Sequence, residues 1–271
     1  MNVKRPSEPT PYWRYNVVAL FFVGIVCGAL QARNASTSDQ PANAATRSVH
    51  DEAVRILNSV RITEYRHRTQ IDETKGVYRC DCSGFVGYVL NRTVAKDVGR
   101  GPFQDGRKHP TAMEYEKSFA AAPVAENAQS GQSSFASRIP QKGTAPGRSR
   151  WQQVVRLLDA RPGDVIAWRH EKPKPGNTGH VIIVDQAPVV EKNGMVRVVE
   201  IDSTTLPWQD DTGAKHGTGI GRRTMWFTVD KNGRPYGYVR GSRSAKLKVE
   251  PISIGRALPV ARKVVVPRPA A

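Results

Sequence analysis

Cys82 is the residue of this sequence with the clearest chemical potential, because it lies among small residues in the run Asp-Cys-Ser-Gly-Phe-Val at 81–86. The apolar residues of 85–90 recur at helical spacing, so we predict that Cys82 begins a helix. The free amides and the dipole of a helix start stabilise a thiolate and lower the pKa of a thiol. Ser83 and Gly84 would leave room for a substrate beside the sulfur. The alternative is a buried cysteine that begins a core helix and does no chemistry.

His180 is the candidate base for this thiol, which needs one within hydrogen-bond reach to act as a nucleophile. It stands at the start of the run Val-Ile-Ile-Val at 181–184, which predicts a strand. The alternative is a polar strand end. The other histidines lie among charges or in Gly/Pro/Lys-rich segments, where we expect surface or loop positions: His50, His67, His109, His170 and His216.

Two carboxylates could orient the imidazole of that base. Residues 195–202 predict a further strand, and side chains alternate along a strand, so Glu200 and Asp202 share one face. Either carboxylate could accept a hydrogen bond from the ring nitrogen of His180 that faces away from the thiol. The alternative for each is a solvated strand edge.

Three segments, in this order, resemble the NlpC-type papain-like cysteine peptidases of bacterial cell walls. They are residues 81–86, Gly-Asp-Val-Ile-Ala-Trp at 163–168 and Gly-His-Val-Ile-Ile-Val at 179–184. Together they cover the core of about residues 50–240. The resemblance implies a papain-like fold and a thiol that attacks amide carbonyls.

The same resemblance implies a role for each candidate residue. Cys82 would be the nucleophile, His180 its base and Asp202 the orienting group. Glu200 is the competing third member, and its use would make the site more similar to that of the related CHAP amidases. The weaker candidates for oxyanion or substrate contacts are Tyr65 and Ser83.

The order of helices followed by strands predicts an α+β fold of the papain-like kind, with helices packed on an antiparallel sheet of about five strands. Helices are expected at residues 47–60, 82–91, 111–121 and 151–158. Strands are expected near 163–168, 180–186, 195–202, 220–229 and 236–240, with hairpin turns at Asn193-Gly194 and Asn232-Gly233. Residues 62–80 are polar and read as a loop.

Composition divides the chain into four parts. Residues 1–30 combine basic residues with an apolar run and are expected to be a signal peptide or an N-terminal anchor, which implies export. Residues 31–46 read as a linker, and residues 47–243 as the hydrolase domain with a mobile insertion at 123–150. Residues 244–271 are basic, contain prolines and are expected to lack a fixed fold.

The formal net charge is +17, and residues 231–271 alone carry ten Lys or Arg against one acid. Such a basic tail is suited to anionic wall polymers or a membrane surface. No signature of a nucleic-acid-binding fold is present, so no specific nucleic acid is expected. We also expect no cofactor and no metal, because Cys80 and Cys82 supply too few ligands for a metal site.

Three hypotheses about function remain open. The first is an exported cysteine amidohydrolase that cleaves peptide or amide bonds, in peptidoglycan stem peptides by resemblance, through a thioester on Cys82. The second is a thiol acyltransferase on the same fold. The third is a non-catalytic wall-binding module, which predicts a buried Cys82 or a His180 that points elsewhere.

Overall fold

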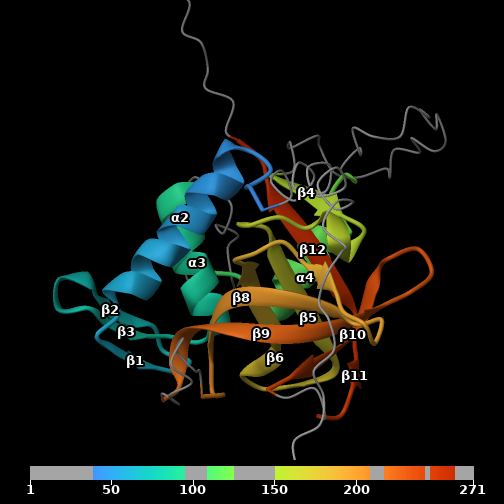
Figure 1. The fold of residues 1–271 in the computed structure, drawn as a ribbon. Helices are drawn as coiled ribbons and strands as arrows, with labels where there is room; N and C mark the ends of the chain where they lie inside the picture. Colours follow the sequence, from blue (N-terminus) through green and yellow to red (C-terminus); the bar gives the residue numbers. More distant parts are fainter. Residues whose placement is uncertain (1–38, 95–108, 125–149, 208–216, 242–244, 260–271) are drawn as a thin grey trace, which may run out of the picture. The chain divides into compact units, whose positions relative to one another are not determined.

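The computed structural model describes residues 39–94, 109–124, 150–207, 217–241 and 245–259 (Figure 1). All of them belong to the second of two compact units, which spans Thr37–Ala271. This unit is a mixed α+β structure in which a few helices pack on a large curled antiparallel sheet. The α+β class expected from the sequence is therefore confirmed.

The large sheet has nine strands in the described part of the chain, so the expected number of about five is wrong. Every strand pairs with its neighbours in antiparallel fashion. In spatial order the strands are β11 (Lys248–Val249), β10 (Pro235–Arg240), β9 (Gly219–Val229), β8 (Val196–Thr204), β6 (Asn177–Val184), β5 (Val165–Lys174), β12 (Ile252–Ala257) and β4 (Trp151–Val154), with β7 (Val189–Val190) paired to β8. Both predicted Asn-Gly turns are present, with φ angles of 79° at Gly194 and 81° at Gly233.

The central strands are buried on both faces, so two apolar clusters form. Val181 and Ile183 of β6 face the helices, whereas Ile182 and Val184 point to the opposite face. On that opposite face the curled sheet packs against itself through aromatic side chains such as Trp168. His180 follows the alternation of this second face, and Cys82 belongs to the helix-side cluster.

The described helices begin at side-chain caps that satisfy their first amides. In α2 (Ala44–Ser59), the Asn43 side chain accepts from two backbone amides of the first turn. In α4 (Ala112–Ala120), Thr111 and Glu114 form a reciprocal capping box. The helix α3 (Cys82–Thr93) begins at Cys82 as predicted, after the cap residue Asp81.

Two segments expected to be a helix and a loop are strands instead. The predicted helix at 151–158 is β4 followed by a short 3-10 helix at Leu157–Asp159, because β4 pairs with β12, and its backbone groups bond to a strand distant in sequence. Residues 62–80 form a small sheet of β1 (Ile62–Glu64), β3 (Val77–Arg79) and β2 (Gln70–Asp72). Strand pairing decides both cases, with a partner distant in sequence for β4 and within residues 62–79 for the small sheet, and local periodicity does not indicate either.

The expected boundary at residue 243 and the unfolded tail that should follow it are also wrong. Strand β12 lies inside the large sheet, between β5 and β4, and buries Ile254 to 1% exposure. Ile252, Ile254 and Gly255 each face a residue of β5 in the register. Residues 252–257 therefore belong to the folded unit in spite of the basic, proline-containing sequence around them.

The motif Gly163-Asp164 fixes this arrangement. Gly163 has a φ of 85°, and a side chain there would collide with the Thr46 backbone of α2. The buried Asp164 carboxylate accepts hydrogen bonds from Arg256 of β12, at 3.0 Å from Nε and 2.8 Å from Nη2. The motif therefore acts structurally, by joining the start of β5 to α2 and β12.

Several expectations concern residues outside the described ranges. These are the signal peptide or anchor at 1–30, the first half of the linker at 31–46, all but the ends of the insertion at 123–150 and the chain from 260 onward. The last three linker residues, 44–46, form the first turn of α2. Of the helices that the structure describes, none is long and apolar enough to cross a bilayer.

Candidate active site

The helix start at Cys82 is already occupied by an anion. Asp81 Oδ1 accepts from the Gly84 backbone amide at 2.6 Å and from the Ser83 hydroxyl at 3.0 Å. The carboxylate therefore uses the amide of the first turn and the positive end of the helix dipole. Ser83, a weak candidate for substrate contact, is part of this cap.

Burial and the Asp81 cap determine the pKa of the Cys82 thiol. Cys82 is only 5% exposed. Burial, as the largest cause, and the charge of Asp81, as the next, raise the pKa of the thiol above its usual value. The backbone N–H of Val181 donates to the sulfur and opposes this effect in part. The lowered pKa expected from the helix start is therefore wrong, and Cys82 rests as a neutral thiol.

His180 and Asp202 meet as the sequence predicted. The ring Nε2 lies 2.6 Å from Asp202 Oδ2, and both side chains are buried. The pairing of β6 with β8, with Ile183 opposite Ile201, places both residues on the same face of neighbouring strands. A short contact to a carboxylate is satisfied when Nε2 carries the proton, which leaves Nδ1 as the basic nitrogen.

The imidazole is neutral over the physiological pH range. Burial lowers the pKa of His180 to about 4, with the Arg240 charge as the next cause, against the opposing effect of Asp202. Within the described part of the chain, the Cys82 thiol makes no hydrogen bond to the ring; the thiol contacts the His180 strand at the Val181 amide. A resting geometry of this kind is common where catalytic hydrogen bonds tighten only with substrate bound.

Two arginines hold the orienting carboxylate as an anion. Arg223 Nη1 donates to Asp202 Oδ1, and Arg240 Nη2 donates to Asp202 Oδ2 at 3.1 Å and to Thr204 Oγ1 at 2.8 Å. Burial alone would raise the pKa of Asp202, but Arg223, His180 and Arg240 together hold it below its ordinary value. Asp202 can therefore stabilise an imidazolium as well as orient the ring.

Glu200, the competing third member, does not contact the imidazole. It is fully buried, and neither carboxylate oxygen has a hydrogen-bond partner among the residues that the structure describes. Burial and the nearby Asp202 charge raise the pKa of Glu200 well above its ordinary value, so it is a neutral acid. The geometry thus favours Asp202, the orienting group that the resemblance implied, over its competitor Glu200.

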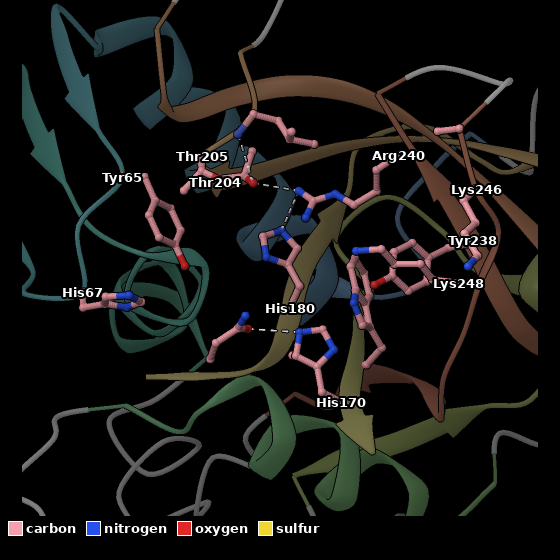
Figure 2. Close-up of a pocket in the computed structure, with 15 residues that line it drawn as sticks. Tyr65, His67, His170, His180, Thr204, Thr205, Tyr238, Arg240, Lys246 and Lys248 are labelled. Atoms are coloured by element: carbon pink, nitrogen blue, oxygen red, sulfur yellow. Dashed lines mark hydrogen bonds between the residues drawn. The ribbon is translucent and has the colours of Figure 1, made fainter. Parts of the chain in front are cut away.

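A pocket of about 530 Å³ opens beside His180 (Figure 2). Tyr65 and His67 line one side of it, and Arg240 lines the other. Burial is the largest cause that raises the pKa of the Tyr65 phenol, which therefore stays protonated and can donate a hydrogen bond. Cys82 itself does not line this pocket.

Three contributors to the site were not identified from the sequence. Arg223 and Arg240 come from the predicted strands β9 and β10, and Trp168 lies directly opposite His180 in β5, with ring centroids 5.1 Å apart. The available signal was a charged residue on a predicted strand, inside it for Arg223 and at its end for Arg240. Their convergence on Asp202 depends on strand order, which the sequence does not state.

Cys80 is a packed residue of the core. It is free, fully buried, and burial raises the pKa of its thiol to about 12. Its carbonyl accepts from Ser203 Oγ at 2.7 Å, which ties the segment before α3 to β8. Among the described residues, no group of three or more His, Cys, Asp or Glu is arranged to hold a metal ion.

No protein-family model, curated protein or solved structure matches this chain. The inference of function therefore depends on the geometry of the site and on the sequence resemblance.

Proposed function

We propose that the protein is a papain-like cysteine amidohydrolase that cleaves peptide or amide bonds through a thioester on Cys82. The observation that carries this proposal is the buried His180–Asp202 pair, in which Nε2 lies 2.6 Å from Oδ2. His180 belongs to β6, the strand whose Val181 amide contacts the Cys82 sulfur. Thiol acyl transfer requires a cysteine whose thiol can ionise and a histidine oriented by a carboxylate, and the chain supplies these groups on α3, β6 and β8.

In the first half of the reaction, the Cys82 sulfur attacks the substrate carbonyl carbon while its proton passes to His180 Nδ1. The tetrahedral intermediate collapses when the C–N bond breaks, and the protonated His180 donates its proton to the leaving amine. In the second half, His180 removes a proton from water, which attacks the thioester. The C–S bond then breaks, the carboxylic acid leaves, and the protonated His180 returns its proton to the Cys82 sulfur.

The neutral resting states of both groups suit this sequence of steps. The buried Cys82 thiol transfers its proton only as the sulfur attacks, and the anionic Asp202 stabilises the imidazolium that forms. The first-turn amide of Cys82 and the Tyr65 hydroxyl are the candidate donors for the oxyanion.

The resemblance to NlpC-type peptidases supplies the proposed setting. We propose peptidoglycan stem peptides as the substrate and the cell envelope, reached by export, as the location. Anionic wall polymers or membrane headgroups are the proposed partners of the basic C-terminal sequence.

A second candidate, a non-catalytic binding module, is favoured by one observation. Cys82 is 5% exposed and does not line the pocket beside His180. Under this alternative the pocket would bind a ligand without chemistry at the sulfur.

Digestion of purified peptidoglycan and its isolated stem peptides tests the proposal. We expect new amine and acid termini by mass spectrometry, each acid carrying heavy oxygen when the reaction runs in labelled water. Cys82→Ala should abolish the products, whereas Cys80→Ala, a matched change in a buried cysteine, should retain them if folded. Products without heavy oxygen would indicate acyl transfer, and binding without products would favour the non-catalytic module.

A further inference from the structure

The end of the pocket at His180 and Arg240 carries more positive than negative charge. Asp202 is the carboxylate that Arg223 and Arg240 share, and His180 is neutral. Glu200 does not balance the second arginine, because its oxygens bond to neither guanidinium and it is protonated. One positive charge is therefore left without a counter-ion, and Arg240 lines the pocket.

The far wall of the pocket adds two lysines to this charge. Lys246 and Lys248 both line the pocket, both are exposed, and they lie in and just before β11. Figure 2 places them on the side of His180 opposite Tyr65 and His67.

Acidic side chains are absent from the described lining of this pocket. Glu250 does not line the pocket, and its carboxylate pairs with two residues of the wall: it accepts from His170 at 2.6 Å and from the Tyr238 hydroxyl at 3.3 Å. A cationic pocket without internal counter-ions attracts an anion, and its walls focus the field.

We propose that this pocket is a subsite for a peptide carboxylate, which pairs with Arg240, Lys246 and Lys248 while the adjoining amide lies at His180. The proposal rests on the proposed function for the identity of the ligand, since a carboxylate is the anionic group found beside amide bonds in peptides. The proposal assigns substrate selection to the segment 245–248, which was expected from the sequence to be part of an unfolded tail.

The subsite should select peptides with a free carboxylate over peptides with a neutral end. A substrate with a free carboxylate near the scissile amide gains an ion pair in a partly enclosed site, and the same substrate with a neutral amide end does not. A single charge interaction of this kind changes affinity by about three- to tenfold.

Equilibrium binding to the full-length Cys82→Ala protein tests this without turnover. The probes are acetyl-trialanine with a free C-terminal carboxylate and the same peptide with a C-terminal amide, each titrated by calorimetry at low and at physiological salt. We expect the acid to bind about three- to tenfold more tightly than the amide at low salt, and the ratio to fall as salt rises.

Adding Lys246→Gln and Lys248→Gln together should reduce the acid-to-amide ratio to less than about twofold. The matched control is Lys231→Gln, an exposed lysine at the β9–β10 turn outside the pocket, which should keep the ratio. Equal binding of acid and amide, or an unchanged ratio in the double lysine variant, would overturn the subsite. A protein that prefers the acid but cleaves no amide would refute the proposed reaction and leave the subsite standing.

Discussion

At the scale of single residues, the site contains two carboxylates on one strand with opposite protonation states. Asp202 is an anion because Arg223, Arg240 and His180 surround it, and Glu200 is a neutral acid because it is buried without a hydrogen-bond partner. The difference arises from partners, since both side chains are fully buried. The two residues should therefore respond differently to amidation.

Asp202→Asn should reduce kcat/KM for a stem peptide by about two to four orders of magnitude, because a neutral amide cannot stabilise the imidazolium and leaves two arginines unpaired. Glu200→Gln replaces one neutral group by another and should change kcat/KM by less than about threefold. Steady-state kinetics of the two variants, with circular dichroism as a control for folding, measures both effects. A larger loss in Glu200→Gln would transfer the orienting role to Glu200.

The pH dependence of activity should report His180. Because burial and Arg240 lower its pKa from 6.5 to about 4, the ring remains a base in mild acid. The acidic limb of kcat/KM should therefore have a midpoint near pH 4. Arg240→Gln removes a cationic neighbour and should move that midpoint upward, whereas Lys231→Gln should not. A limb near 6.5 in the unmodified protein, or an unmoved limb in Arg240→Gln, would contradict this assignment.

The lowered pKa of His180 also links protonation to the stability of the fold. Between pH 6.5 and about 4 the unfolded chain binds a proton at His180 that the folded chain does not. The contribution of this residue to stability is therefore fully present above 6.5 and is lost as the pH falls toward 4.

At the scale of elements, the start of β6 positions His180 by a close backbone contact. Gly179 has a φ of 145°, and a β-carbon there would lie 1.9 Å from the Trp168 carbonyl oxygen. Gly179→Ala should therefore displace His180 from Asp202, and we expect a loss of activity larger than the loss of stability. Gly217→Ala, with no atom within 4 Å of the added carbon, is the matched control. Normal kinetics in Gly179→Ala would show that the contact does not position the ring.

The element that the sequence analysis placed in an unfolded tail is β12. Deleting residues 260–271 keeps β12 and the Arg256 partner of Asp164, so we expect the protein to retain a cooperative melting transition and its activity on a small peptide. Deleting residues 245–271 removes β12 and the Arg256 partner of Asp164, and we expect no cooperative melting transition. Thermal melts of the two truncated proteins distinguish these outcomes, and a folded 1–244 fragment would show that β12 is dispensable.

At the scale of the whole molecule, the sequence predicted what depends on local pattern. Cys82 at a helix start, His180 on a strand and the shared face of Asp202 and Glu200 all follow from short-range periodicity, and the structure has each of them. The strand β6 begins at Asn177, however, so His180 does not stand at its start as predicted. The choice between Asp202 and Glu200 required the strand order that brings Arg223 and Arg240 beside one of them.

The predictions that were wrong concern long-range contacts. Strands β4 and β12 form because they pair with each other, and neither has a pattern that identifies it alone. The pKa of Cys82 depends on Asp81 at the cap and on burial under residues distant in sequence. Part of the positive charge of the C-terminal sequence also belongs to the pocket beside His180, since Lys246 and Lys248 line it.

The central claim is that Cys82 becomes acylated during turnover. The most direct measurement is mass spectrometry of the intact protein, acid-quenched during cleavage of a stem peptide and then digested to locate the adduct. We predict an acyl group of the substrate on Cys82, absent in Cys82→Ala and retained in a folded Cys80→Ala protein. Cleavage that continues undiminished in Cys82→Ala, or an adduct located on Cys80, would contradict the account.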